Sequence, residues 1–173
     1  MRHKGLTGKF IGQIVFGFED GVISSLGIAA GLAGASLSNF IIIIGIIVQA
    51  FTGAVSMSAG TYLSTKSEMQ YLTSGKRHRD IKHHIKNPLD AAFFMFISYI
   101  LGSMVPIVPY VINAFGQPLI PALIISIIGL FIFGSLRTII TGGSWIKNGI
   151  EMTVIGMIAF VVGYFIGSLF SPQ

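Results

Sequence analysis

The 173-residue sequence contains no cysteine and few charged residues. Without cysteine, the chain has no disulfide framework, no thiolate metal site and no cysteine nucleophile. Its 11 Lys and Arg and 6 Asp and Glu make up 10% of the residues, against about a quarter in a typical soluble protein. The sequence also lacks a phosphate loop, a nucleophile elbow and a zinc-protease helix, so we expect that the protein is not an enzyme.

More than half of the residues are apolar. Apolar residues make up 53% of the chain, and the mean hydropathy is +0.82. Five segments reach the roughly 20 apolar residues that a membrane-spanning helix needs. They are residues 10–37, 40–65, 89–112, 119–140 and 150–170. We therefore predict an all-α integral membrane protein with five transmembrane helices, forming a single domain over residues 1–173. Within the third segment, Pro106 and Pro109 are expected to kink or end the helix.

The basic residues predict an orientation. In the five-helix arrangement all 11 fall on one side of the membrane. They are Arg2, Lys4, Lys9, Lys66, Lys76, Arg77, Arg79, Lys82, Lys86, Arg137 and Lys147. Because cytoplasmic loops carry the excess of Lys and Arg, we predict a cytoplasmic N-terminus and a C-terminus on the outer side. The net charge of +5 has the same explanation, and we expect no nucleic-acid partner.

Two acidic residues lie deep inside the first segment. Asp20 is ten residues beyond Phe10, which at helical rise places it about 15 Å into the membrane, near the midplane. An ionised residue at this depth costs at least about 2.5 kcal/mol on insertion scales and by default marks a functional site. Glu19 points about 100° away from Asp20 on the helix. We interpret both as candidate metal ligands; the alternative is structural acids that pair with neighbouring polar groups.

Met57 in the second segment is the candidate partner of Asp20. It lies nine residues before Lys66, about 13.5 Å into the membrane, so both residues have a similar depth on consecutive antiparallel helices. A carboxylate and a thioether together suit a borderline transition metal better than Mg²⁺ or Ca²⁺. Without Asp20, Met57 would be interpreted as a packing residue. Nearby motifs such as Gly17-x-x-x-Gly21 and Gly27-x-x-x-Gly31 favour close helix packing and self-association.

Residues 66–88 form a short basic loop in this arrangement. The loop contains His78, His83 and His84, whose imidazoles could bind a metal. The Lys and Arg residues among them repel a cation, which favours a solvated loop that faces lipid headgroups.

Further acids lie near the cytoplasmic ends of the helices. They are Glu68, Asp90 and Glu151. These residues could form an acidic vestibule for a cation, or they could pair with nearby basic residues.

Four stretches of the sequence carry recognisable motifs. They are Phe18-Glu-Asp-Gly-Val-Ile-Ser-Ser-Leu-Gly-Ile-Ala-Ala-Gly-Leu-Ala-Gly-Ala, Gly53-Ala-Val-Ser-Met-Ser-Ala-Gly-Thr-Tyr-Leu-Ser-Thr-Lys-Ser-Glu68, Pro106-x-x-Pro-Tyr110 and Gly149-Ile-Glu-Met-Thr-Val-Ile-Gly156. Together they resemble the vacuolar iron transporter family over nearly the whole chain. The resemblance implies a five-helix homodimer that exchanges cytosolic Fe²⁺, and often Mn²⁺, for protons. It also implies a pathway at the dimer interface, lined by an Asp and a Met that match Asp20 and Met57.

The sequence departs from the plant and parasite type of this family in three ways. Gln49 stands eight residues before Met57, where those proteins carry Glu, and Gln13 stands seven residues before Asp20, where they carry an acid. They also insert a carboxylate-rich cytoplasmic metal-binding domain where this sequence has only its short basic loop. The sequence therefore resembles a short form of the family. The missing acids leave the metal and the proton coupling open, and we hypothesise that Glu19 supplies part of the missing charge.

The leading hypothesis is a divalent metal transporter for Fe²⁺ and/or Mn²⁺ that exports its substrate from the cytoplasm in exchange for protons. The predicted metal ligands are Asp20, Met57 and Glu19, with Gln49, Glu68 and Glu151 as weaker candidates. The expected partners are the lipid bilayer and a second copy of the chain, with no resident cofactor. The alternatives are a non-transporting membrane scaffold or assembly protein that retains the fold, and a transporter of another cation. We expect the plasma membrane of a prokaryotic cell.

Overall fold

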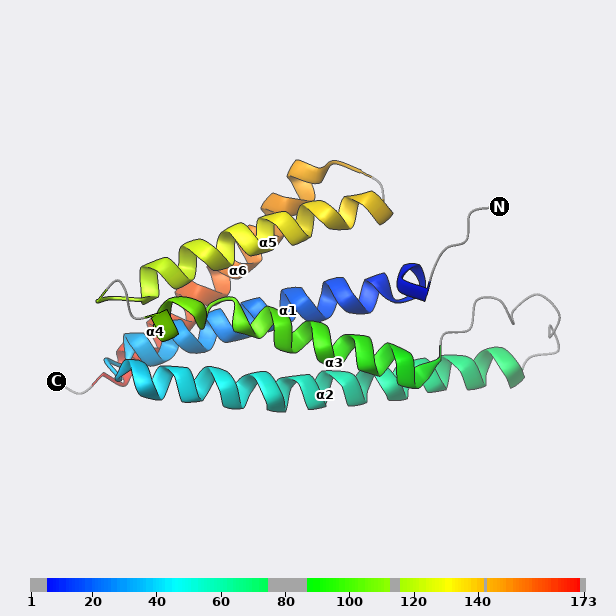
Figure 1. The fold of residues 1–173 in the computed structure, drawn as a ribbon, viewed down its shortest axis with the longest axis horizontal. Coiled ribbons are helices and arrows are strands. Elements are labelled where there is room, and N and C mark those ends of the chain that lie inside the picture. The colour runs from blue at the N-terminus through cyan, green and yellow to red at the C-terminus, as the bar shows by residue number, and fades with distance from the viewer. Residues whose placement is uncertain (1–5, 75–86, 113–115, 142, 172–173) are drawn as a thin grey trace.

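Figure 1 shows a bundle of long helices. The computed structural model describes residues 6–74, 87–112, 116–141 and 143–171, and over these residues it contains helices and no strands. The helices are α1 (Leu6–Gly34), α2 (Asn39–Ser74), α3 (Pro88–Met104), α4 (Val108–Ile112), α5 (Leu119–Thr141) and α6 (Trp145–Leu169). The long helices alternate in direction along the chain (Figure 1). The predicted all-α fold is confirmed.

The composition of the helices is that of a membrane protein. Among the described residues, α1, α2, α5 and α6 are long and apolar enough to cross a membrane, and the apolar α3 is shorter, with 17 residues. Large apolar side chains face outward, including Val154, Ile158 and Phe165 of α6. Contiguous apolar surface of this kind is not tolerated in water but is what lipid requires. The chain is an integral membrane protein.

The third predicted helix is interrupted near its end. The sequence predicted one helix over residues 89–112, but α3 ends at Met104 and the short α4 follows. The backbone N–H of Val105 closes the last turn by donating to the carbonyl of Gly102, at 3.1 Å. Pro106 comes next, and it has no N–H with which to continue the helix. The expected effect of the prolines is therefore confirmed, and it divides the segment in two.

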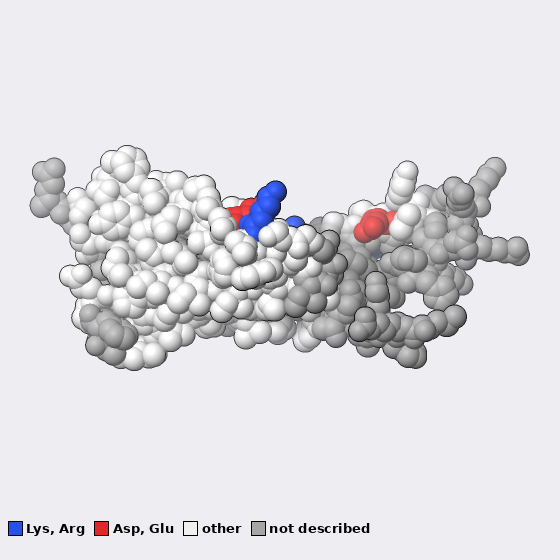
Figure 2. All heavy atoms as spheres, turned by 90° about the horizontal axis from the view of Figure 1, so that it is seen from above, with Lys and Arg blue, Asp and Glu red and all other residues white. Residues whose placement is uncertain are grey.

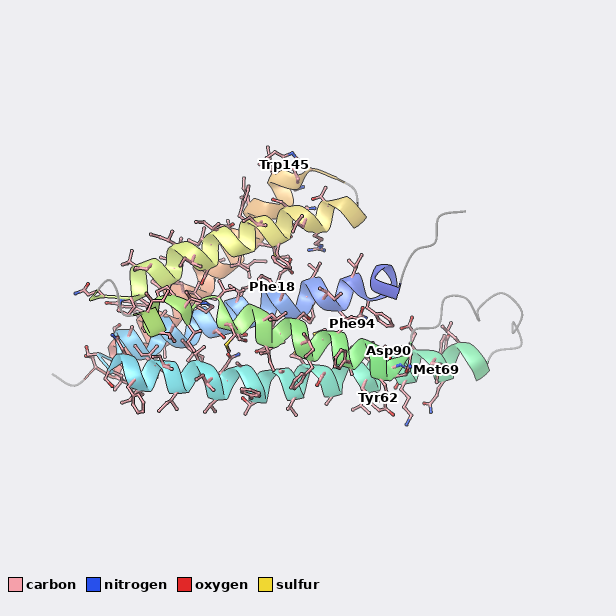
Figure 3. All side chains as sticks on the ribbon, in the orientation of Figure 1. Phe18, Tyr62, Met69, Asp90, Phe94 and Trp145 are labelled. Carbon is pink, nitrogen blue, oxygen red and sulfur yellow. The ribbon has the colours of Figure 1, made fainter. Side chains whose placement is uncertain are left out.

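The second helix extends nine residues further at its C-terminal end than expected. It continues to Ser74 instead of ending at residue 65, because residues 66–74 contain neither glycine nor proline to break it. The Lys66 ammonium lies over the ring of Tyr62, one turn earlier, at 5.7 Å from its centroid. Tyr62 and Met69 lie at the end of the bundle where α2 passes Asp90 in the first turn of α3 (Figure 3). The predicted loop histidines, His78, His83 and His84, lie outside the described residues.

The remaining helix ends differ by a few residues. α1 begins four residues earlier and ends three residues earlier than predicted, and α6 begins at Trp145 instead of residue 150. The start of α6 follows Ser144, whose backbone is extended, and Trp145 lies at the upper edge of the bundle in Figure 3.

Helix α1 occupies the centre of the bundle. It packs against α2, α3, α5 and α6. Phe10 stacks on Phe94 of α3 with ring centroids 5.1 Å apart, and Phe18 stacks on Phe133 of α5 at 3.6 Å. Figure 3 shows Phe18 near the middle of α1 and Phe94 beside its N-terminal half. The middle of α1 is thus enclosed on several sides.

Glycines let α1 approach its neighbours backbone to backbone. A β-carbon added at Gly102 of α3 would collide with the carbonyl oxygen of Phe18. A β-carbon at Gly167 of α6 would likewise collide with the carbonyl oxygen of Gly31. Membrane helices associate through such close contacts because lipid supplies no hydrophobic drive between them.

We expect Gly167→Ala to destabilise the protein. Overpacking typically costs about 1–3 kcal/mol, so the melting temperature in detergent should fall by several degrees. Gly129→Ala in α5 is the matched control, because a β-carbon there would make only an ordinary contact, 3.7 Å from Cγ1 of Val105, and alanine favours a helix. Differential scanning fluorimetry checks both variants. Equal melting temperatures for the two would contradict the close contact of α1 with α6.

Candidate metal site

A cavity of about 520 Å³ lies beside the middle of α1. Both acids of the first segment, Glu19 and Asp20, line it, together with apolar residues of α1 and α6 such as Ile23 and Met152. Asp20 is equally far from the two ends of α1. The share of one water in the liquid is about 30 Å³, so the cavity has room for a partly hydrated ion. The sequence correctly placed the two acids deep in a helix, and the structure adds that they share one cavity.

Glu19 is the more deeply buried of the two acids. Its side chain is 5% exposed, and its Oε1 atom makes no hydrogen bond within the described residues. Arg137 of α5 lines the same cavity and attracts the Glu19 carboxylate, whereas Glu151 of α6 repels it. A buried carboxylate is costly unless an opposite charge or hydrogen bonds compensate it. Glu19 is therefore a carboxylate with unused ligand capacity.

Asp20 has a polar neighbour on its own helix. The hydroxyl of Ser24, one turn further along α1, donates to Oδ1 of Asp20 at 3.5 Å. Tyr99 of α3 is close enough to interact electrostatically with the Asp20 carboxylate and lies beside Ser24 as well. In the part of the chain that the structure describes, this long hydrogen bond is the one made to Asp20, and it leaves most of the acceptor capacity of the carboxylate available to a cation.

Gln49 joins three helices through its side-chain amide. Its Nε2 donates to the hydroxyl of Tyr99 at 2.6 Å, and its Oε1 accepts from the hydroxyl of Ser25 at 2.8 Å. Gly53, one turn along α2, leaves the space that the Tyr99 ring occupies. Gln49 is a secondary candidate ligand from the sequence, and in this structure both ends of its amide are already used. The hydrogen bond to Tyr99 nevertheless connects Gln49 with the Asp20 site.

The other predicted ligands lie farther away. Met57 is half-buried on α2 and does not line the cavity of Glu19 and Asp20. The Ser25–Gln49 pair gives the register of α1 and α2, from which Met57 lies about 4.5 Å beyond the level of Asp20 along the helix axes. Glu151 is exposed but acts on Glu19. Glu68 is exposed on the last turns of α2, outside the cavity.

Within the described residues there is no group of three or more His, Cys, Asp or Glu side chains that could hold a metal ion. Two carboxylates alone do not fill the coordination shell of a divalent ion, which takes at least four ligands. Water, backbone carbonyls or a second subunit would have to supply the rest. An incomplete set of ligands is suited to binding that is reversible.

A comparison with known protein families identifies the family of this chain. The model of the VIT family matches residues 11–84 and 74–168. The chain belongs to the VIT family. The two matched parts meet within residues 74–84, between α2 and α3, which agrees with a short member that lacks an inserted domain at this point.

Similar members of the VIT family include proteins from plants and yeast. The chain is 26% identical to "Vacuolar iron transporter" of Centaurea cyanus, over 94% of this chain and 88% of the relative. It is 26% identical to "Vacuolar iron transporter 1" of Arabidopsis thaliana, over 91% and 85% of the two chains. For "Protein CCC1" of Saccharomyces cerevisiae the identity is 23%, over 91% and 68%. These relatives are eukaryotic, and they give no support to the predicted prokaryotic plasma membrane.

Sequence reasoning missed two residues of the site in this VIT family member. Arg137 was interpreted only as a marker of the cytoplasmic side, and Tyr99 was not singled out. Arg137 could have been noticed, because three further uncharged residues of the apolar segment follow it. Nothing in the sequence indicates that the Tyr99 hydroxyl meets Gln49, 50 residues away along the chain.

Removal of the Tyr99 hydroxyl should destabilise the protein. In Tyr99→Phe the Gln49 amide loses its acceptor in a part-buried position, which costs about 1–3 kcal/mol. The triple variant Ser25→Ala, Gln49→Leu and Tyr99→Phe should recover part of the loss, because it leaves neither an unpaired amide nor an unpaired hydroxyl. Tyr164→Phe is the control, at an exposed tyrosine of α6. If thermal melts give equal melting temperatures for Tyr99→Phe and Tyr164→Phe, the Gln49–Tyr99 hydrogen bond contributes nothing to the stability of the protein.

Proposed function

We propose that this VIT family member carries a divalent transition metal, Fe²⁺ and/or Mn²⁺, out of the cytoplasm in exchange for protons. The observation that carries the proposal is the pair Glu19 and Asp20, adjacent carboxylates that line one cavity at the middle of a membrane helix. Acids at this depth are rare outside ion pathways. The names of the plant relatives point to iron as a substrate. The protein is thus a transporter and not an enzyme.

Asp20 is the central ligand in this proposal. Its carboxylate binds the metal when ionised and takes up a proton when the site is empty, so the two substrates compete for one group. The apolar walls of the cavity strengthen the attraction between the carboxylate and a cation, because the local dielectric is low. Glu19 adds a second negative charge from the neighbouring position. Competition for the same carboxylate couples the two flows.

Met57 is the soft ligand of the proposed route. A thioether favours Fe²⁺ or Mn²⁺ over Mg²⁺ and Ca²⁺. Met57 lies about 4.5 Å beyond Asp20 along the helix axes, which is less than the rise of one helical turn. We place Met57 next to Asp20 on the path of the ion. The orientation set by the basic residues makes the end of α2 near Lys66 the cytoplasmic end.

A homodimer is part of the proposal, and α2 offers a surface for it. Small residues, Thr52, Ser56, Ala59 and Gly60, follow one another along an exposed face of α2. On a lipid-facing helix such residues favour association with another helix, since backbones can approach closely there. These four residues form a stripe of small side chains that lies next to Met57 in sequence. A dimer formed on this stripe would enclose the proposed route of the ion.

Asp20→Asn should abolish most metal transport. Loss of one carboxylate charge weakens binding of a divalent ion by about tenfold or more, because each 1.4 kcal/mol of lost attraction is tenfold. The assay is Mn²⁺ or Fe²⁺ uptake into proteoliposomes driven by a pH gradient. Asp90→Asn is the matched control, since Asp90 lies in the first turn of α3 and does not line the cavity. Equal uptake by Asp20→Asn and the wild type would remove Asp20 from the mechanism.

A titration of thermal stability separates the transporter from its alternatives. A metal that binds only the folded protein must raise the melting temperature. We expect a rise with Mn²⁺ or Fe²⁺. If Fe²⁺, Mn²⁺, Co²⁺, Zn²⁺ and Ni²⁺ all leave the melting temperature unchanged, a non-transporting scaffold that retains the fold becomes the better explanation. A rise with one of the other ions alone would identify a transporter of another cation.

The stripe on α2 can be tested by crosslinking. Because the chain has no cysteine, Ser56→Cys introduces one unique thiol, and mild oxidation should join two subunits in a disulfide. Val154→Cys, on the exposed face of α6, is the control and should remain monomeric on a non-reducing gel. A dimer from Val154→Cys but not from Ser56→Cys would place the interface elsewhere.

A further inference from the structure

The cavity beside α1 contains a third charged group that the proposed transport step does not use. Arg137 lines the cavity together with Glu19 and Asp20, although it comes from a different helix. It is the only charged residue of α5, and α6 adds Lys147 and Glu151 nearby in sequence. Figure 2 shows basic and acidic side chains adjoining near the middle of the face, with white surface to their left.

Glu19 is the group on which Arg137 acts. Glu19 is 5% exposed, and its Oε1 has no hydrogen-bond partner within the described residues. The attraction exerted by Arg137 exceeds the repulsion exerted by Glu151. A carboxylate so placed requires compensating positive charge, either from the protein or from a bound cation. An arginine remains charged under all physiological conditions, so its compensation is permanent.

We propose that Arg137 is a resident counter-cation of the carboxylate pair: its guanidinium balances Glu19 while the site is empty and competes with the divalent metal for the same negative charge. This inference rests on the proposed function, because it assigns a role within that same site. In this role Arg137 sets the affinity of the site for the metal and is not a metal ligand.

The charges lining the cavity show why such a residue is useful. With both carboxylates ionised and one guanidinium beside them, the metal-free site carries one negative charge before Asp20 takes up a proton, and the site loaded with a divalent ion carries one positive charge. Without Arg137 the empty site would carry two negative charges and the loaded site none. In a low-dielectric surrounding the neutral, loaded state would then be strongly favoured, and the metal would be held. Arg137 thus limits the affinity of the site for the divalent metal and allows the metal to be released.

The first test measures metal affinity and turnover on the full-length protein. We expect Arg137→Gln to bind Mn²⁺ about tenfold more tightly than the wild type, since removal of a nearby positive charge favours the cation. In proteoliposomes, KM for Mn²⁺ and the maximal rate should both fall. Arg137→Lys should stay close to the wild type, and so should the control Lys147→Gln, at an exposed base of α6. Unchanged or weaker Mn²⁺ binding by Arg137→Gln would overturn the inference.

The second test needs no metal, and it separates failure of this inference from failure of the proposed function. Arg137→Gln should lower the melting temperature of the metal-free protein by several degrees, and Glu19→Gln in the same chain should restore part of it. Coupling of this kind between two sites is what a double-mutant cycle measures. If Arg137→Gln does not fold, the double variant should still fold. Additive effects of the two substitutions would show that Arg137 does not balance Glu19, whether or not the wild type binds Mn²⁺.

Discussion

The close backbone contact of α1 with its neighbours is the constraint on which the structure depends. Gly102 lets α3, and Gly167 lets α6, come into contact with carbonyl oxygens of α1. In lipid, helices gain little by hiding apolar side chains from each other, so packing of this kind holds the bundle together. It also decides where the site can lie. A central helix that is surrounded on several sides can shelter the carboxylates of Glu19 and Asp20 from lipid.

Much of the fold could be predicted from the sequence. The scarcity of charge predicted a membrane protein, and the spacing of apolar segments located the four long apolar helices and the shorter α3 to within a few residues at most ends. The errors have physical causes. Hydropathy detects the part of a helix that is in lipid, so it missed the polar last turns of α2 up to Ser74. Hydropathy also continues through the break at Pro106, where the chain stays apolar but loses its N–H donor, so that break was predicted from the proline itself.

The site could be predicted only in part, because depth is readable from sequence and lateral contact is not. Counting residues from the ends of a segment placed Glu19 and Asp20 correctly in the middle of their helix. The same counting cannot tell which face of α1 meets α5, and so it gave no reason to connect Arg137 with Glu19. For Met57 the estimated level relative to Asp20 was close, but the cavity is lined by α1, α5 and α6 and not by α2, and the sequence does not specify which helices border it.

The amide of Gln49 gives the local hydrogen bonds a direction. An amide both donates and accepts, whereas an ionised carboxylate only accepts. Here the nitrogen of Gln49 donates to the Tyr99 oxygen, so the Tyr99 proton is free to turn toward Ser24 and the side of Asp20. A glutamate in this position would draw that proton to itself and reverse the chain of donors. One nitrogen atom in place of one oxygen therefore determines whether the polar groups of three helices point toward Asp20 or away from it.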